Sequence, residues 1–142
     1  MAMSSEFAVG VHALVFLCHK KTTLSSELLA ENVCTNPARI RKVLAKLKKA
    51  GLVSTKEGLG GGYCFTLDPA RVTLRQVEEA VEERLVYAAW KPGNTDMECL
   101  VASGMAGVLD GIYADLDELC KRRLGEITIQ DIENQIFAEA NA

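Results

Sequence analysis

Apolar residues return every three or four positions early in the chain, which is the spacing of one face of a helix. One such stripe runs from Phe7 to Cys18, behind Ser4 or Ser5 as the candidate N-cap. A second, shorter helix follows Ser25, whose hydroxyl suits an N-cap because it can accept a hydrogen bond from a free backbone N–H. The N-terminal part therefore predicts two helices in succession.

The next segment predicts a helix with two sharply different faces. Asn36 suits the N-cap, Pro37 stands where proline is tolerated in the first turn, and Gly51 can end the helix. The apolar stripe, which should pack on the core, is Ile40, Val43, Leu44 and Leu47. The opposite stripe is Arg39, Lys42, Lys46 and Lys49, with Arg41 and Lys48 on its flanks. Because a solvated face usually interleaves Glu with such cations, this helix is expected to present a cationic ridge.

A β-hairpin is predicted next. Two short extended runs, 52–56 and 63–67, are joined by the glycine-rich segment 57–62, and glycine permits the positive φ angles of a tight turn. A glycine-rich loop can also hold phosphate, but nucleotide-binding loops lie between a strand and a helix and end in Gly-Lys-Ser/Thr. Neither feature is present here, so a mononucleotide site is not expected.

The C-terminal half predicts three further helices. Thr73 and Gln76 have the spacing of a capping box and open a short helix to about residue 83, which a loop at 84–96 follows. A long helix is expected over 97–124, opened by Thr95 and Glu98, and a last short helix over 128–137.

The long helix carries a near-heptad apolar seam: Val101, Met105, Val108, Ile112, Leu116 and Leu119. At about 1.5 Å per residue the helix would span about 40 Å, which is longer than the remaining domain needs. A partner helix is therefore the expected occupant of the seam, and burial against the chain's own domain is the alternative.

Charge is distributed unevenly. The net charge of −3 over 142 residues combines +4 in residues 1–68, from nine Lys/Arg and five Asp/Glu, with −7 in residues 69–142, from seven and fourteen. The split suggests that the first half meets a polyanion, although two differently solvated surfaces would give the same numbers.

Composition indicates one globular domain, or one domain plus an appended helical segment, since 49% of residues are apolar and 25% charged. No apolar run reaches the roughly 18–20 residues of a membrane span, and residues 1–7 lack the Lys or Arg of a secretory signal. Five cysteines, an odd number, do not favour a disulfide framework. We therefore expect a protein of the reducing cytoplasm, without membrane contact.

Two short helices, a cationic helix and a hairpin, in this order, predict a winged helix-turn-helix. The fold class is mainly α with a small β-hairpin wing, divided into a DNA-binding domain at 1–83, a loop at 84–96, and a dimerisation helix with a short C-terminal helix at 97–142. Double-stranded DNA is the expected partner, with the cationic helix in the major groove and the wing near the backbone or minor groove. The candidate DNA-binding residues are Ser25, Thr35, Asn36, Pro37, Ala38, Arg39, Arg41, Lys42, Lys46, Lys49, Lys56, Gly58, Gly60, Gly61, Gly62 and Tyr63.

The sequence also resembles the Rrf-two family of bacterial regulators, the IscR/NsrR/CymR type. The likeness covers about residues 6–83 in detail and the long helix in outline. The matching stretches are Leu24-Ser25-Ser26-Glu27-Leu28-Leu29-Ala30, Leu47-Lys48-Lys49-Ala50-Gly51-Leu52-Val53, Gly58-Leu59-Gly60-Gly61-Gly62-Tyr63 and Val72-Thr73-Leu74-Arg75-Gln76-Val77. The resemblance implies a homodimeric transcriptional regulator, usually a repressor. Thr35-Asn36-Pro37 resembles the branch that has no iron–sulfur cluster.

Two departures from the family pattern matter. Glu57 stands where the family commonly has an arginine before the wing glycine, which puts a minor-groove arginine contact in doubt, although Lys56 could partly replace it. Cluster-binding members carry three cysteines in and before the long helix, whereas here that region offers Cys99, and Cys120 follows 21 residues later. Neither a cofactor nor a metal site is expected, and a cluster-binding sensor is kept as an alternative.

Two cysteines are candidate thiol sensors. Cys34 precedes the cationic helix and Cys99 opens the long one, and helix N-termini lower the pKa of a thiol. A buried, inert thiol is the competing interpretation, and it is the default for Cys18 and Cys64. The effector could instead be a small molecule held near Tyr87 and Trp90.

Two other classes of protein were weighed. An enzyme would need converging catalytic groups, but His12 and His19 are the only histidines, both in or at the end of the first helix, and no metal-ligand spacing is present. A winged-helix module that binds protein would differ from a DNA reader in its insensitivity to salt. The regulator remains the leading hypothesis.

Overall fold

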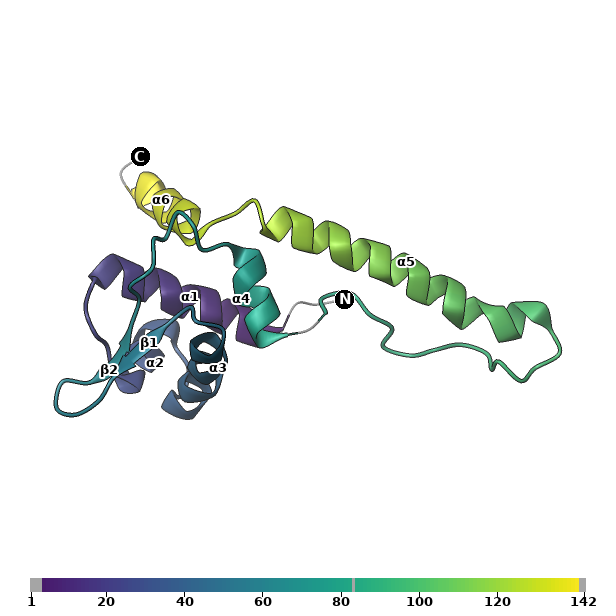
Figure 1. Cartoon of the computed structure of the whole chain (residues 1–142), viewed down its shortest axis with the longest axis horizontal. Helices are drawn as coiled ribbons and strands as arrows, with labels where there is room; N and C mark the ends of the chain where they lie inside the picture. The colour runs from purple at the N-terminus through teal and green to yellow at the C-terminus, as the bar shows by residue number, and fades with distance from the viewer. Residues whose placement is uncertain (1–3, 83, 141–142) are drawn as a thin grey trace.

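The computed structural model describes residues 4–82 and 84–140 and contains six helices and one two-stranded sheet among them. A long helix projects from the body formed by the other elements, and the loop that precedes it runs out along its side (Figure 1). In chain order the elements are α1 Ser5–Lys20, α2 Ser26–Val33, α3 Pro37–Lys49, β1 Ser54–Lys56, β2 Gly62–Cys64, α4 Leu74–Val81, α5 Leu100–Leu124 and α6 Ile129–Ala140. The chain is thus mainly α with a small β-hairpin, as its sequence predicts.

Side-chain caps fix the beginnings of the first four helices. Ser4 accepts a hydrogen bond from the Glu6 N–H at the start of α1, Ser25 caps α2, and Asn36 caps α3. Thr73 and Gln76 form the predicted capping box at the start of α4. Each cap satisfies backbone donors that a helix leaves open, so these boundaries follow from the local sequence.

One hydrophobic core joins α1, α2, α3 and α4. The apolar stripe of α3 is completely buried, as are leucines from α1 and α2. The largest fully buried apolar side chains are Leu14, Leu17, Leu29, Ile40, Val43, Leu44, Leu47, Val77 and Ile129. Because the whole apolar face of α3 is buried in this core, the charged side chains of α3 face solvent or the neighbouring helices.

The C-terminal helix α6 packs on the body, against α1 (Figure 1). Its first residue, Ile129, is fully buried in the core, and the Ile129 N–H donates to the Val72 carbonyl at 2.9 Å. A second backbone bond runs from the Leu74 N–H to the Ile127 carbonyl at 2.8 Å. The short helix that the sequence groups with the long one in the segment 97–142 therefore packs against α1 of the body.

The long helix begins later than predicted. α5 starts at Leu100 with Cys99 as its N-cap and no side-chain capping bond, so the capping box expected of Thr95 and Glu98 is wrong. Asn94 explains the difference, since its Oδ1 accepts from the Asp96 N–H at 2.9 Å and its carbonyl from the Met97 N–H at 3.1 Å. These bonds form a turn that occupies the positions where the first helical turn was expected.

The base of α5 is tied to the segment after α4 by one carboxylate. Asp117 accepts the N–H groups of Leu85 and Val86 on a single oxygen, at 2.6 and 2.9 Å, and pairs with Lys121 at 3.3 Å. Burial favours the neutral acid, but the bonds from Val86 and Leu85 outweigh it and lower the pKa of Asp117. The charged form of Asp117 therefore fixes the place where α5, which we call the arm, leaves the body that the other elements form.

Candidate nucleic-acid interface

The solvent-facing line of α3 alternates alanines with lysines. Ala38, Lys42, Ala45 and Lys49 are all exposed, and their spacing of four, three and four residues places them on one face. Arg41 and Lys48 flank this line and are exposed as well. This face has long cations and, between them, side chains small enough to allow a close approach to another surface.

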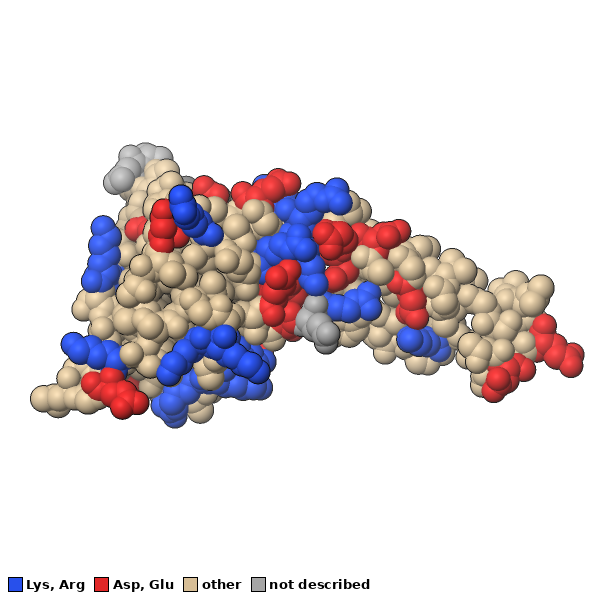
Figure 2. All heavy atoms as spheres, in the orientation of Figure 1, with Lys and Arg blue, Asp and Glu red and all other residues tan. Residues whose placement is uncertain are grey.

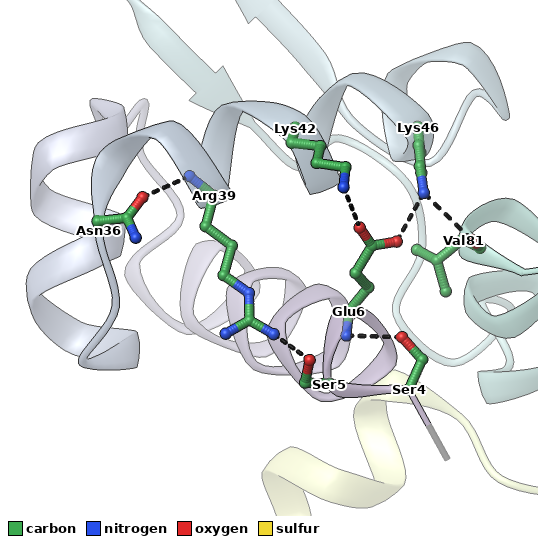
Figure 3. A network of polar contacts seen from close by, with 8 residues as sticks. All are labelled: Ser4, Ser5, Glu6, Asn36, Arg39, Lys42, Lys46 and Val81. Atoms are coloured by element: carbon green, nitrogen blue, oxygen red, sulfur yellow. Dashed lines mark hydrogen bonds and ion pairs between the residues drawn. The ribbon is translucent and has the colours of Figure 1, made fainter. Parts of the chain in front are cut away.

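Two of the six cations turn away from this line. Arg39 and Lys46 are half-buried and point toward α1 (Figure 3). The Arg39 guanidinium contacts the Ser5 hydroxyl, while Lys46 donates to a Glu6 carboxylate oxygen at 2.6 Å and to the Val81 carbonyl at 3.4 Å. The expected stripe of four equivalent cations is therefore divided between a solvent face and an interhelical contact.

Glu6 also reaches the solvent-facing line. Its other carboxylate oxygen lies 3.2 Å from the Lys42 ammonium, so one acid bridges two lysines one helical turn apart (Figure 3). The hydrogen bond from Lys46 is the main reason that the pKa of Glu6 is lowered. At neutral pH this carboxylate is a fixed negative charge beside the cationic face.

A second acid lies at the other edge of α3. Arg41 donates to the Ser26 hydroxyl at 3.2 Å and lies 3.9 Å from the Glu27 carboxylate, both in the first turn of α2. Because Arg41 and Glu27 are both exposed, Arg41 can readily exchange its contact with Glu27 for a contact with another anion. Lys48 and Lys49 have no ion pair within the part of the chain that the structure describes.

The charge pattern on the surface follows this division. Lys and Arg gather over the edge of the body that holds α3, whereas basic and acidic side chains are intermixed where the body meets α5 and along α5 (Figure 2). The edge that holds α3 is therefore the part of this face that favours a polyanion most.

The hairpin lies next to α2 and projects its tip outward. Thr55 pairs with Tyr63, and Tyr63 exchanges two backbone hydrogen bonds with Leu24, at 2.8 and 2.9 Å. A Cβ on Gly62 would lie 2.3 Å from the Leu24 carbonyl oxygen, so this position requires glycine for the fold itself. The free tip is the exposed turn at 57–60, beside the exposed Lys56.

The remaining predicted DNA-binding residues cluster around the N-terminus of α3. The Asn36 Oδ1 accepts the Arg39 N–H at 2.8 Å, so its amide nitrogen is the part still able to donate outward. Thr35 and Pro37 are half-buried and Ala38 is exposed. Ser25 uses its hydroxyl to cap α2, where it accepts the Leu28 N–H at 3.2 Å.

The predicted seam of α5 is open to solvent. Its six side chains are between 39% and 66% exposed: Val101, Met105, Val108, Ile112, Leu116 and Leu119. A Cβ on any of the three glycines of this helix would meet nothing within 4 Å. An apolar stripe this long is unusual on the surface of a single chain.

The cysteines differ in environment. Burial raises the pKa of Cys18 to about 11, with a further contribution from Glu133, whose carboxylate lies 3.2 Å from the thiol. Cys99 is exposed, and the N–H groups of Ala102 and Val101 lower its pKa. Cys34 is the exposed C-cap of α2, with a left-handed φ of 65°, and Cys64 is only half-buried, against Ser54.

The effector site suggested near Tyr87 and Trp90 is not enclosed at these residues. Both side chains are exposed in the loop before α5, at 62% and 77%.

Among residues 4–82 and 84–140, none of the helices is both long and apolar enough to cross a bilayer.

Sequence reasoning missed the polar groups that share the site with the cations. Glu6, Ser5 and Ser26 all contact side chains of α3, yet none was among the candidate DNA-binding residues. A signal was present, because six cations on a short helix without local acids need counterions from elsewhere, and Glu6 stands in the first turn of its own helix.

Comparison with known proteins places this geometry in a family. Residues 3–135 match the family Rrf2, described as an iron-dependent transcriptional regulator. A Bacillus subtilis protein named as an HTH-type transcriptional regulator, YwnA, is 28% identical over 135 residues, which are 95% of this chain and 99% of the relative.

Solved structures share the fold. A Lactobacillus plantarum protein named as a transcriptional regulator superposes with a TM-score of 0.80 at 24% identity, over 92% of this chain and 89% of its own. CymR of B. subtilis, named as its global cysteine regulator, superposes with a TM-score of 0.70 at 18% identity, over 95% and 98%.

The family description names iron, and the residues of this chain do not fit a metal site. In the described ranges no three or more His, Cys, Asp or Glu side chains are grouped so that they could hold a metal ion. Cys99 and Cys120 stand 21 residues apart on one helix, about 30 Å at 1.5 Å per residue. Two ligands so far apart cannot share one cluster within a chain.

Proposed function

The chain belongs to the Rrf2 family of transcriptional regulators, and on this premise we propose that it is a homodimeric repressor acting in the cytoplasm. In this proposal α3 enters the major groove of double-stranded DNA and the β1–β2 wing lies against the adjacent backbone. The observation that carries the proposal is the division of α3 into a fully buried apolar stripe and an exposed face of lysines and alanines.

The contacts sort by side-chain chemistry. Arg41, Lys42 and Lys49 are exposed cations and would meet phosphates, which position the helix without reading sequence. Ala38 and the Asn36 amide stand at the N-terminus of α3, the end of a recognition helix that faces base edges. Lys56 and the turn at 57–60 would follow the backbone from the wing.

The dimer is supported by the exposed seam of α5. One winged helix reads only a few base pairs, and a two-fold dimer would place two copies of α3 on one face of the DNA. The seam residues are apolar, lie on one stripe and are exposed in the single chain, so a second α5 would cover them.

The signal is a separate part of the proposal. Among the cysteines, Cys99 combines exposure with a lowered pKa, which makes it the better candidate for an oxidant- or electrophile-sensing thiol. Cys34, the other candidate, lies beside the start of α3, where a modification would place bulk near the DNA. We therefore propose that the dimer carries no iron–sulfur cluster and that its signal acts on a cysteine thiol.

Salt-dependent DNA binding tests the proposal. Fluorescence anisotropy would measure binding to a duplex enriched by in vitro selection, from about 50 to 300 mM salt. Replacing Lys49 by Ala should weaken binding and reduce the slope of log K against log salt by about 0.9, the value for one phosphate contact. Lys91→Ala, the same charge change on a residue outside the body, should leave the slope unchanged. Binding that changes neither with salt nor with Lys49→Ala would refute DNA reading by α3.

A further inference from the structure

Glu6 places a negative charge against the helix that is proposed to read DNA. It projects from α1 between Lys42 and Lys46 and satisfies both with its two carboxylate oxygens (Figure 3). An acid in this place opposes the approach of phosphate, so its presence calls for a physical reason.

The two ion pairs of Glu6 are unequal. Lys46 is 38% exposed, lies 2.6 Å from the carboxylate and also donates to the carbonyl of Val81, the last residue of α4. Lys42 is 69% exposed, lies 3.2 Å away and has only this one ion pair within residues 4–82 and 84–140. Lys46 is therefore held by two elements, whereas Lys42 can leave Glu6 by rotating into solvent.

We propose that Glu6 is a positioning residue that pins Lys46 between α1, α3 and α4 and competes with DNA phosphate for Lys42. The inference rests on the proposed function, because it assumes that the exposed face of α3 meets DNA. It assigns to Glu6 a role in how tightly any duplex is held, separate from the side chains that read the sequence.

The competition acts on the sequence-independent part of binding. A lysine that contacts phosphate releases a counterion from DNA and gains affinity for every sequence alike. If Lys42 must first leave Glu6, part of that gain is lost, and Glu6 is left near the phosphates without its partner. Contacts with base edges are unaffected, so Glu6 lowers operator binding and non-specific binding by about the same factor and leaves their ratio unchanged.

The test compares three proteins on two duplexes. The variants are Glu6→Gln, which keeps the size of the side chain but removes its charge, and Glu98→Gln, which makes the same chemical change in the loop before α5. The probes are the selected duplex and an unrelated duplex of equal length, each titrated over the salt series by anisotropy. Circular dichroism and thermal melting check that each variant folds.

With Glu6→Gln we expect affinity for both duplexes to rise about three- to tenfold near 100 mM salt, and the salt slope to steepen by up to about 0.9. The ratio of operator affinity to random-duplex affinity should stay the same, because the change is common to both duplexes. Glu98→Gln should match the wild type. Equal behaviour of Glu6→Gln and Glu98→Gln would overturn the inference while leaving DNA binding itself intact, whereas salt-independent binding by the wild type would overturn the proposed function.

A second comparison keeps the question answerable if Glu6→Gln does not fold. Lys42→Ala removes an exposed side chain, and part of its contact with DNA was offset by the broken pair with Glu6. It should therefore cost less affinity than Lys49→Ala, because Lys49 has no ion pair with any residue that the structure describes. An equal or larger loss for Lys42→Ala would show that Glu6 does not compete for it.

Discussion

Glu78 is the charged group whose burial should dominate the pH dependence of stability. It lies on α4 with no exposed surface, and neither carboxylate oxygen has a hydrogen-bond partner among the described residues. Burial raises the pKa of Glu78 from 4.5 to about 7, opposed by the nearby Lys121 and reinforced by Asp117. The native state therefore prefers this acid in its neutral form.

The direction of the effect follows from proton binding. Between about pH 4.5 and 7 the folded chain binds this proton more tightly than the unfolded chain does, so the stabilisation is complete below 4.5 and is lost as pH rises through 7. A shift of roughly 2.5 units corresponds to about 3 kcal/mol at most, and about 2 to 3 kcal/mol is a fair expectation for the penalty at pH 8.

Glu78→Gln removes that penalty because an amide of nearly the same shape carries no charge. We expect the free energy of unfolding at pH 8 to rise by about 2 kcal/mol over the wild type, a gain of several degrees in Tm, and the gain to vanish near pH 4.5. Urea unfolding at a fixed protein concentration across pH 4.5–8 measures it. Glu79→Gln, an exposed neighbour paired with Arg75 at 2.8 Å, is the control and should change stability by under about 1 kcal/mol at every pH.

A pH-independent loss of stability in Glu78→Gln would refute this reasoning. It would mean that Glu78 is ionised and well partnered in the native state, so that removing its charge removes a favourable contact rather than a desolvated one.

Three other outcomes can be checked directly. Ile112→Glu should convert the dimer to a monomer in multi-angle light scattering, while Asp115→Asn on the same helix should not; a monomeric wild type would contradict the dimer. Cys99 should react fastest and Cys18 slowest with iodoacetamide at pH 7, read by peptide mass spectrometry, because their pKa values are moved in opposite directions; the reverse order would contradict the thiol assignment. Asn36→Ala should lower the free energy of unfolding by about 1 kcal/mol through loss of the cap on α3, and Asn36→Asp should retain it; equal losses would show that the cap contributes little.

The features that the sequence predicts well are those decided within one helical turn. Ser25, Asn36 and Thr73 each cap a helix through a backbone group three residues away, and the stripe of α3 from Ile40 to Leu47 is buried as its spacing requires. The start of α5 was mispredicted for the same local reason. Asn94 forms a turn that competes with a capping box, and nothing in the spacing of Thr95 and Glu98 reveals which arrangement is the more stable.

The candidate site was predicted less completely because its partners are distant in sequence. Glu6 and Lys46 are 40 residues apart, and Asp117 meets the Leu85 N–H across 32 residues. Helical periodicity says which face of α3 is cationic, but only the packing of α1 beside it shows that Arg39 and Lys46 are turned inward. The count of positive charges on a helix is thus an upper limit to the number that a partner can use.

These contacts show which of the positive charges in residues 1–68 are exposed and which are paired with acids of the same chain. Four of the nine cations of residues 1–68 lie on α3 with exposed side chains, and the acids that pair with cations of α3 come from α1 and α2 rather than from α3 itself. α4 connects this region to the arm, since its last carbonyl accepts from Lys46 while the segment after it is held by Asp117 of α5. The helix proposed to meet DNA is therefore held by a charged group at the end of α4, and the helix proposed to meet a second chain is held by another at the segment that follows α4.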